Sequence, residues 1–146
     1  MYICIVETRN TYHMNMYHLS RMNHDEVTFF PRVPKSVRED EDNITQRICF
    51  SKTISGAWRA HPAVGAGDLN GMTRYTDMYV HVPANKVNHF AVKKPDSCEV
   101  YDSSITDEIW LMEPAKLKCI GKIRIGSHQY REDKRYKVSF RWLRKF

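Results

Sequence analysis

The chain lacks any apolar run long enough to cross a membrane as a helix. In 146 residues, the apolar stretch at residues 2–6 is far shorter than the roughly 20 residues that a membrane helix needs. This stretch also has neither the basic flank nor the small-residue cleavage site of a signal peptide. We therefore expect a protein that stays in the cytoplasm where it is made and that does not act in a membrane.

Cysteine is scarce, and its four positions are Cys4, Cys49, Cys98 and Cys119. No two of them form a C-x-x-C pair, so the ligand spacing of a zinc site is missing. A disulfide framework is unusual in an unsecreted domain of this size. Three of the four lie within apolar runs, where a free cysteine behaves as a small buried hydrophobe. We expect free thiols and no metal site.

Motifs of the common catalytic sites are also missing. Gly65, Gly67 and Gly71 form a glycine-containing stretch, but no G-K-[ST] follows, so this is not a phosphate loop. The scattered His24, His61, His89 and His128 have no acid or cysteine at the spacing of a nucleophilic site. The sequence therefore excludes the most readily recognised hydrolases and phosphate-loop proteins.

The chain does have the size and composition of a folded single domain, covering residues 1–146. Hydrophobic residues make up 42% and charged residues 27%, which is ordinary for a globular protein. The net charge is +6, and residues 130–146 hold seven Lys or Arg but only two acids. This basic C-terminal strand or tail, residues 126–146, predicts a phosphate-bearing or nucleic-acid partner. Alternatively, it is an edge strand that Lys and Arg protect against aggregation.

Short apolar or alternating runs predict about seven strands and one or two helices. The strand candidates are residues 2–6, 16–20, 47–51, 78–82, 106–112, 117–125 and 136–143, with a weaker one at 99–101. Ile54, Ala57 and Trp58 lie at helical spacing, with Ser51 as the expected N-cap and Pro62 as the stop. Residues 23–42 predict a long loop. Because strands dominate without regular helical alternation, we expect a compact α+β fold with a mostly antiparallel, split sheet.

Two early groups of residues are suited to holding a nucleotide. In Tyr17-His18-Leu19-Ser20, His18 can donate to a ribose or a diphosphate, or it is a half-buried histidine of the core. In residues 47–51, Arg47 can pair with phosphate and Phe50 can stack on a base or nicotinamide ring. Ser51 would stand at a helix start, where backbone N–H groups favour anions. The alternative is a core strand followed by an ordinary N-cap.

The third group is the alternating stretch at residues 106–112. Glu108, Trp110 and Met112 share one side of the expected strand, with Ile109 and Leu111 on the other. If the second side packs on the core, Glu108 and Trp110 form one wall of a cleft. A carboxylate beside an aromatic ring suits a ribose hydroxyl or an oxocarbenium-like centre. The alternative is an edge strand with an incidental acid.

In chain order, the three groups resemble the ADP-ribosyltransferase fold. That family places a histidine on an early strand, an aromatic or serine on a later one, and then a glutamate; the matching positions are His18, Phe50-Ser51 and Glu108. The chain is also similar to small proteins of bacteria and their phages. There a Tyr-His-x-Ser stretch precedes Pro-Arg-Val-Pro, which here contains Arg32, then Arg-x-Cys-Phe and Glu-Ile-Trp-x-x-x-Pro. The match extends from about residue 16 to residue 125.

The resemblance implies a cleft for an NAD-like or ADP-ribose-like nucleotide, linear or cyclic, with no covalently bound cofactor. The implied ligand-binding residues are Tyr17, His18, Ser20, Arg32, Arg47, Phe50, Ser51, Glu108 and Trp110. One function is a binding module that captures a nucleotide signal, as phage counter-defence proteins do in infected bacteria. The other is an enzyme that transfers ADP-ribose or cleaves NAD, with His18 and Glu108 as catalytic residues.

The departures from the family favour the binding module. Histidine-type enzymes have a tyrosine where Phe50 stands, and serine-type enzymes have an arginine where His18 stands, so the chain mixes both patterns. A third hypothesis is RNA or DNA binding through the basic end and its aromatics, which are Tyr130, Tyr136, Phe140 and Trp142. A strand would show the same alternation, and self-association stays open.

Overall fold

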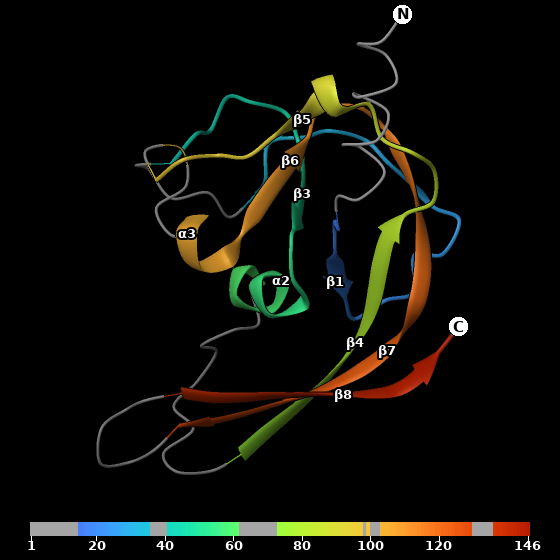
Figure 1. The fold of residues 1–146 in the computed structure, drawn as a ribbon, viewed down its shortest axis with the longest axis vertical. Coiled ribbons are helices and arrows are strands. Elements are labelled where there is room, and N and C mark those ends of the chain that lie inside the picture. The colour runs from blue at the N-terminus through green and yellow to red at the C-terminus, as the bar shows by residue number, and fades with distance from the viewer. Residues whose placement is uncertain (1–14, 36–40, 62–72, 98, 100–102, 130–135) are drawn as a thin grey trace, which may run out of the picture.

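The protein is seen in a computed structural model that describes residues 15–35, 41–61, 73–97, 99, 103–129 and 136–146. These residues form two antiparallel sheets. The larger sheet has the order β1-β4-β7-β2, with β8 added against β7, and the smaller has the order β3-β6-β5. The described part is thus α+β-like with mostly antiparallel strands, as predicted. Figure 1 shows the two sheets as separate layers, with α2 between them at one end.

The elements of the larger sheet are β1 (His18–Ser20), β2 (Thr28–Phe29), β4 (Thr73–Pro83), β7 (Ala115–Gln129) and β8 (Tyr136–Lys145). Those of the smaller sheet are β3 (Ile48–Ser51), β5 (Val92–Lys93) and β6 (Glu108–Leu111). The helices are α2 (Ile54–Ala60), α3 (Ser103–Thr106) and the 3₁₀ turn η1 (His89–Ala91).

Two clusters of apolar side chains make the core. In the first, Leu19, Met78 and Ile123 of the larger sheet pack against Ala57 and Trp58 of α2. The second fills the space between the two sheets; its buried members are Met16, Ile48, Phe50, Ile109, Leu111 and Leu117. Burial of these alternating apolar positions is the main driving force that holds the layers together.

Helix α2 begins two residues later than the sequence predicts. Thr53 is the N-cap, and its side chain accepts a hydrogen bond of 2.9 Å from the Gly56 N–H. The prediction of Ser51 as the N-cap was wrong, because Ser51 ends β3 and its backbone pairs with Tyr17. Gly56 lies so close to α3 that a Cβ there would stand 2.1 Å from the Thr106 carbonyl oxygen. Only glycine allows this approach.

Most predicted strands are found, and several are longer than the pattern indicated. β4 and β7 extend well past residues 78–82 and 117–125. The predicted strand at 106–112 is shorter, because Thr106 belongs to α3 and Asp107 has a φ of 50° before β6 begins. The predicted loop at 23–42 contains the short strand β2. The candidate strand at 2–6 and most of the one at 99–101 lie outside the described residues, as does Pro62.

β8 is the edge of the larger sheet and is largely exposed. It pairs with β7 along its length, with a register shift at Lys122/Ile123. From residue 137 onward, Val138 is its half-buried residue and the other side chains are exposed. Among the described residues, no helix is long and apolar enough to span a membrane.

Candidate functional site

The pairing of β3 with β6 decides which predicted site residues share a face. Cys49 lies opposite Trp110, Phe50 opposite Ile109, and Ser51 opposite Glu108. Because side chains alternate along a strand, Cys49 and Trp110 point to one side of this layer. Phe50 and Ile109 point to the other side, into the core between the sheets. The small sheet therefore separates the predicted residues into two groups.

On the first side, Arg47 stacks on Trp110. The Arg47 Cζ atom lies 4.0 Å from the centroid of the Trp110 ring. Trp110 is fully buried and Arg47 is 3% exposed. The Arg47 Nη1 donates a hydrogen bond of 2.8 Å to the Thr45 carbonyl and lies 3.7 Å from an Asp42 oxygen. The ring face and the guanidinium are thus already occupied by each other.

Glu108 is engaged on the same side. Its Oε1 atom accepts a hydrogen bond of 2.9 Å from the Trp110 indole N–H. The residue is buried, at 9% exposed. Burial, with the nearby Glu108 carboxylate as a second cause, raises the pKa of the Cys49 thiol to about 12. Cys49 is a free cysteine, and as a thiol rather than a thiolate it is a poor nucleophile.

Ionic groups surround this buried pair. The Thr45 hydroxyl and backbone N–H groups hold the pKa of the Asp42 carboxyl at about 2, below its ordinary value. Lys93 forms an ion pair with Glu99, and its Nζ lies 5.7 Å from the Trp110 ring centroid. The Trp110 ring therefore lies among cations and hydrogen bonds of the protein's own, which stabilise the layer.

On the second side, His18 lies against aromatic rings at the junction of the two sheets. Its ring centroid is 5.4 Å from that of Phe29 and 6.3 Å from that of Phe50, in edge-on geometry. His18 Nδ1 lies 3.4 Å from the Cys49 carbonyl oxygen. Burial lowers the pKa of His18 from 6.5 to about 4, so the ring is neutral at neutral pH. His81 lies 6.0 Å away, centroid to centroid.

Hydrogen bonds among half-buried polar side chains lie next to His18. The His24 Nε2 atom lies 3.0 Å from the Ser20 hydroxyl, which also accepts from the Met22 N–H. The backbone N–H of His24 donates to His81 Nε2 at 2.9 Å. We call His18, Ser20, His24, Phe29 and Phe50 the seam. Among the described residues, no three His, Cys, Asp or Glu side chains are arranged to hold a metal ion.

The predicted site is therefore not one cleft. His18 and Phe50 lie together at the seam, whereas Arg47, Glu108 and Trp110 lie together on the opposite face of the β3–β6 layer. The expectation that Glu108 and Trp110 line an open wall fails, because both sides of β6 are buried.

The other predicted residues are scattered as well. Tyr17 packs against the first core cluster, Ser51 is buried, and Arg32 is exposed. Arg32 exchanges backbone hydrogen bonds with Arg47. Ser20 belongs to the seam.

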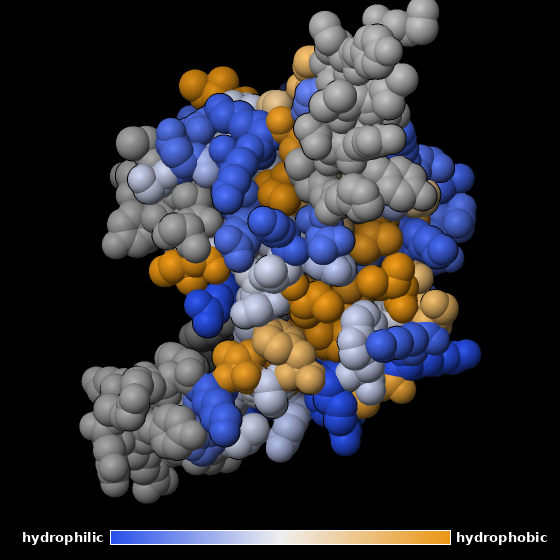
Figure 2. Space-filling model, in the orientation of Figure 1, coloured by the Kyte–Doolittle hydropathy of each residue, from blue (hydrophilic) through white to orange (hydrophobic). Residues whose placement is uncertain are grey.

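A second region carries exposed polar and aromatic residues. On the side of the larger sheet that faces away from the core, register brings together Tyr75, Gly126 and Ser139, and beside them Asp77, Arg124 and Arg141. We call the outward-pointing side chains of β4, β7 and β8 the outer face. Its cations are Lys122, Arg124, Lys137, Arg141 and Arg144, and its acid is Asp77. Hydrophilic side chains lie along the lower edge of the molecule in Figure 2, on the side of these strands.

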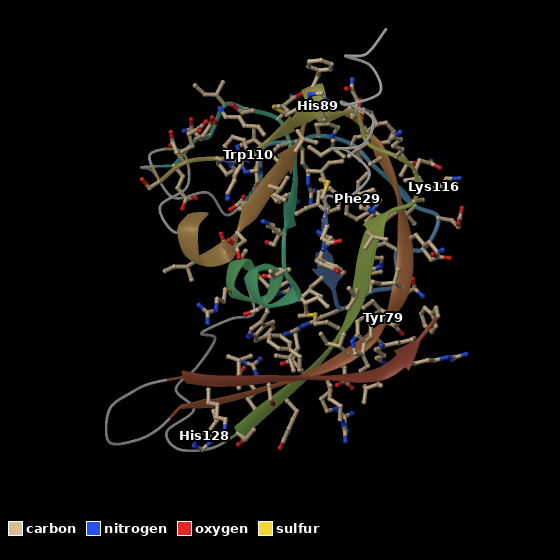
Figure 3. All side chains as sticks on the ribbon, in the orientation of Figure 1. Phe29, Tyr79, His89, Trp110, Lys116 and His128 are labelled. Carbon is tan, nitrogen blue, oxygen red and sulfur yellow. The ribbon has the colours of Figure 1, made fainter. Side chains whose placement is uncertain are left out.

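The outer face is hollowed at its middle. A depression of about 560 Å³ is lined by Tyr75, Asp77, Arg124, Gly126, Ser139 and Arg141. Tyr75 is 68% exposed. In Figure 3, Tyr79 and His128 mark this part of the sheet, far from Trp110 in the other layer.

The charges of the hollow are unequally compensated. Asp77 and Arg124 form a two-pronged pair, with Nε–Oδ1 at 2.8 Å and Nη2–Oδ2 at 3.0 Å. This hydrogen-bonded pairing lowers the pKa of Asp77 and raises that of Arg124. Within the described residues, the Arg141 guanidinium makes no hydrogen bond or ion pair. Asp77 also attracts Arg141 electrostatically, but the hydrogen-bond donors of Arg141 are the ones in the hollow that are available to an anion.

Sequence reasoning located the basic end but missed its partners. Arg141 lies in the predicted basic segment and Arg124 in the strand predicted at 117–125, whereas Tyr75 and Asp77 lie before the strand predicted at 78–82. The alternation of Tyr75, Asp77 and Tyr79 with Met78 and Val80 was the available signal for an outward polar and aromatic side.

Comparisons of the chain with protein-family models, with curated proteins and with solved structures find no match. The resemblance to ADP-ribosyltransferases stays a prediction that rests on the order of three sequence groups.

Proposed function

We propose that the protein binds nucleic acid through its outer face. The observation that carries the proposal is that the exposed Tyr75 ring and the Arg141 guanidinium, which makes no hydrogen bond or ion pair with the described residues, line one hollow. Proteins that bind single strands combine a cationic groove with aromatic rings on which bases stack. The net charge of +6 adds a long-range attraction for phosphate.

The outer face is wide enough for a polynucleotide that runs along β7 and β8. Neighbouring strands lie about 4.8 Å apart, so the rows from β4 to β8 span about 10 Å. Lys122, Lys137 and Arg144 flank the hollow on both sides along β7 and β8. Such a chain of cations can follow several phosphates of one polynucleotide.

The experiment is a titration of a short, fluorescent single-stranded oligonucleotide at several salt concentrations, read by anisotropy. Binding should weaken steeply with salt, because each phosphate contact releases counterions. Arg141→Ala should flatten the slope of log K against log salt by about 0.7 for one lost contact.

Lys116→Ala is the matched control, because Lys116 lies at the other end of β7 and forms an exposed ion pair with Glu26 (Figure 3). It should leave the slope unchanged. Equal effects of the two variants would overturn the assignment to the outer face, and absence of binding at low salt would overturn the function.

A second candidate is capture of an NAD-like or ADP-ribose-like nucleotide at the seam. The observation that favours it is that His18 stays half-buried rather than closed off, with Phe50 on one side and Ser20 and His24 nearby. Glu108 lies on the opposite face of the β3–β6 layer, so this arrangement supports a binder, such as one that sequesters a phage or bacterial nucleotide signal. It does not support an ADP-ribosyl transfer enzyme using His18 and Glu108 together.

Incubation with NAD and a panel of cyclic nucleotides tests the second candidate. A ligand released intact by heat indicates a binder, and free nicotinamide in the supernatant indicates an enzyme. His18→Ala should abolish retention, whereas Arg141→Ala should not. Retention that survives His18→Ala would exclude the seam.

A further inference from the structure

We infer that the outer face binds unpaired nucleotides, with one base stacked on Tyr75 and the adjoining phosphate on Arg141, so that its ligands are single-stranded rather than duplex. This inference rests on the proposed function and specifies the ligand of the same site. It follows from the placement of Tyr75, from the charge pattern of the hollow and from its size.

The position of the Tyr75 ring depends on the glycine at position 126 of the neighbouring strand. A Cβ on Gly126 would stand 3.3 Å from Tyr75 Cε1 and 2.8 Å from the Ser139 hydroxyl oxygen. Glycine at this position of β7 thus lets the Tyr75 ring lie across the neighbouring strand, while 68% of the residue stays exposed. An exposed ring supported from below is a stacking surface for a base.

The charge pattern gives the ligand an orientation. Arg124 is matched by Asp77 through two hydrogen bonds, so the β4 side of the hollow carries little net charge. The β8 side carries the unpaired Arg141 and the Ser139 hydroxyl. A phosphate is therefore attracted more strongly by Arg141 than by the neutralised Asp77–Arg124 pair. The base therefore lies toward Tyr75 and Asp77, and the phosphate lies toward β8.

The size of the hollow fits one nucleotide unit. Pockets that hold small molecules enclose about 300–1,000 Å³, and this hollow has about 560 Å³. In a duplex the bases are stacked on each other and reach a flat protein surface only at groove edges. A duplex could touch the cations through its phosphates but could not place a base on Tyr75.

The same chemistry, an aromatic base joined to a phosphate, is present in a free nucleotide. The flanking cations Lys122, Lys137 and Arg144 lie outside the hollow. They would contact additional phosphates only in a polynucleotide. The ligand that we infer is therefore a single-stranded polynucleotide and not a free nucleotide.

The test compares four ligands with the intact protein at one salt concentration: a single-stranded oligonucleotide, its duplex, an abasic strand of equal charge, and a mononucleotide. The single strand should bind about 5- to 150-fold more tightly than the abasic strand, which is the range of one base–aromatic stacking contact. Tyr75→Ala should remove this difference, and Tyr75→Phe should keep it.

A second variant fills the hollow without changing any charge. Gly126→Val should abolish the preference for the intact strand over the abasic strand, and Thr73→Val, on the outer face at the start of β4, should not. Thermal melting of both variants confirms that they are folded. Tyr75 is exposed, so Tyr75→Ala keeps the question answerable if Gly126→Val does not fold.

The outcomes separate the inference from the function. Equal binding of intact strand, duplex and abasic strand would overturn the inference while the proposed function survives. A mononucleotide that binds as tightly as the strand would overturn the choice of a polynucleotide. Absence of binding to all four ligands would overturn the proposed function together with the inference.

Discussion

The face of the β3–β6 layer that carries Arg47 and Trp110 and the outer face of β4, β7 and β8 contain the same kinds of residue in opposite states. In the first, Trp110 is fully buried under Arg47. In the second, Tyr75 is 68% exposed and lines the same hollow as Arg141. An aromatic ring and an arginine therefore stabilise the fold when both are covered, and both stay accessible from solvent when they are exposed.

The difference arises from what surrounds each arginine. Arg47 donates to the Thr45 carbonyl and lies near Asp42, so its charge is compensated after leaving water. A buried charge without such partners would be strongly unfavourable. Arg141 remains hydrated and keeps its attraction for anions. Three predictions test this contrast, from the largest expected effect to the smallest.

Trp110→Ala should lower the free energy of unfolding by about 3–5 kcal/mol. The change leaves a large cavity, removes the ring on which Arg47 stacks, and removes the N–H that donates to Glu108. Tyr75→Ala should change it by less than about 0.5 kcal/mol, since the ring is exposed. Chemical denaturation followed by circular dichroism measures both. Similar losses of unfolding free energy for the two variants would contradict the contrast between a buried and an exposed aromatic ring.

Acidification should destabilise the protein through the half-buried His18, and not through the exposed cations of the outer face. The pKa of His18 is about 4 in the folded protein and 6.5 as an ordinary value. The unfolded chain therefore binds the proton more readily, and stability is lost as the pH falls from 6.5 toward 4. The loss for this group amounts to roughly 3 kcal/mol.

Denaturation midpoints across this pH range measure the effect. His18→Gln should flatten the dependence of stability on pH. Burial also lowers the pKa of His81, so this residue adds a smaller loss of stability as the pH falls. A profile that is the same in the variant and in the natural chain would contradict the burial of His18.

Arg47→Met should cost about 2 kcal/mol of stability, from the lost cation–π contact and hydrogen bond, partly offset by the apolar packing of the methionine stem. Arg141→Met should have no measurable effect on stability while weakening oligonucleotide binding. Thermal melts and anisotropy titrations on the same samples give both quantities. The pair of variants would contradict the contrast if Arg47→Met weakened binding without destabilising the fold.

The antiparallel α+β character could be predicted from the sequence because it depends on local patterns. The apolar residues of 47–51, 78–82 and 117–125 lie in strands, and Ile54, Ala57 and Trp58 lie in a helix. The N-cap was assigned to Ser51 instead of Thr53, since both are good N-caps and only the pairing of Ser51 with Tyr17 decides between them.

The site could not be predicted to the same extent, because it depends on long-range register. His18 and Glu108 are each placed correctly on a strand. The side that Glu108 faces is decided by its pairing with Ser51, and the direction of His18 by the pairing of β1 with β4 and by the Tyr17–Ser51 bridge. No local pattern specifies these long-range pairings. The hollow likewise needs β8 to pair with β7 so that Ser139 lies opposite Gly126.

The exposure of β8 has a consequence for how the protein moves. Its backbone is held by hydrogen bonds to β7, but its side chains from residue 137 onward contribute little to the core, with Val138 as the main contact. Segments of this kind open locally at a lower free energy than the rest of a domain. In hydrogen–deuterium exchange, β8 amides should therefore exchange before those of β4. A bound oligonucleotide that contacts both Tyr75 and Arg141 would slow the amide exchange of β8 and leave that of β6 unchanged.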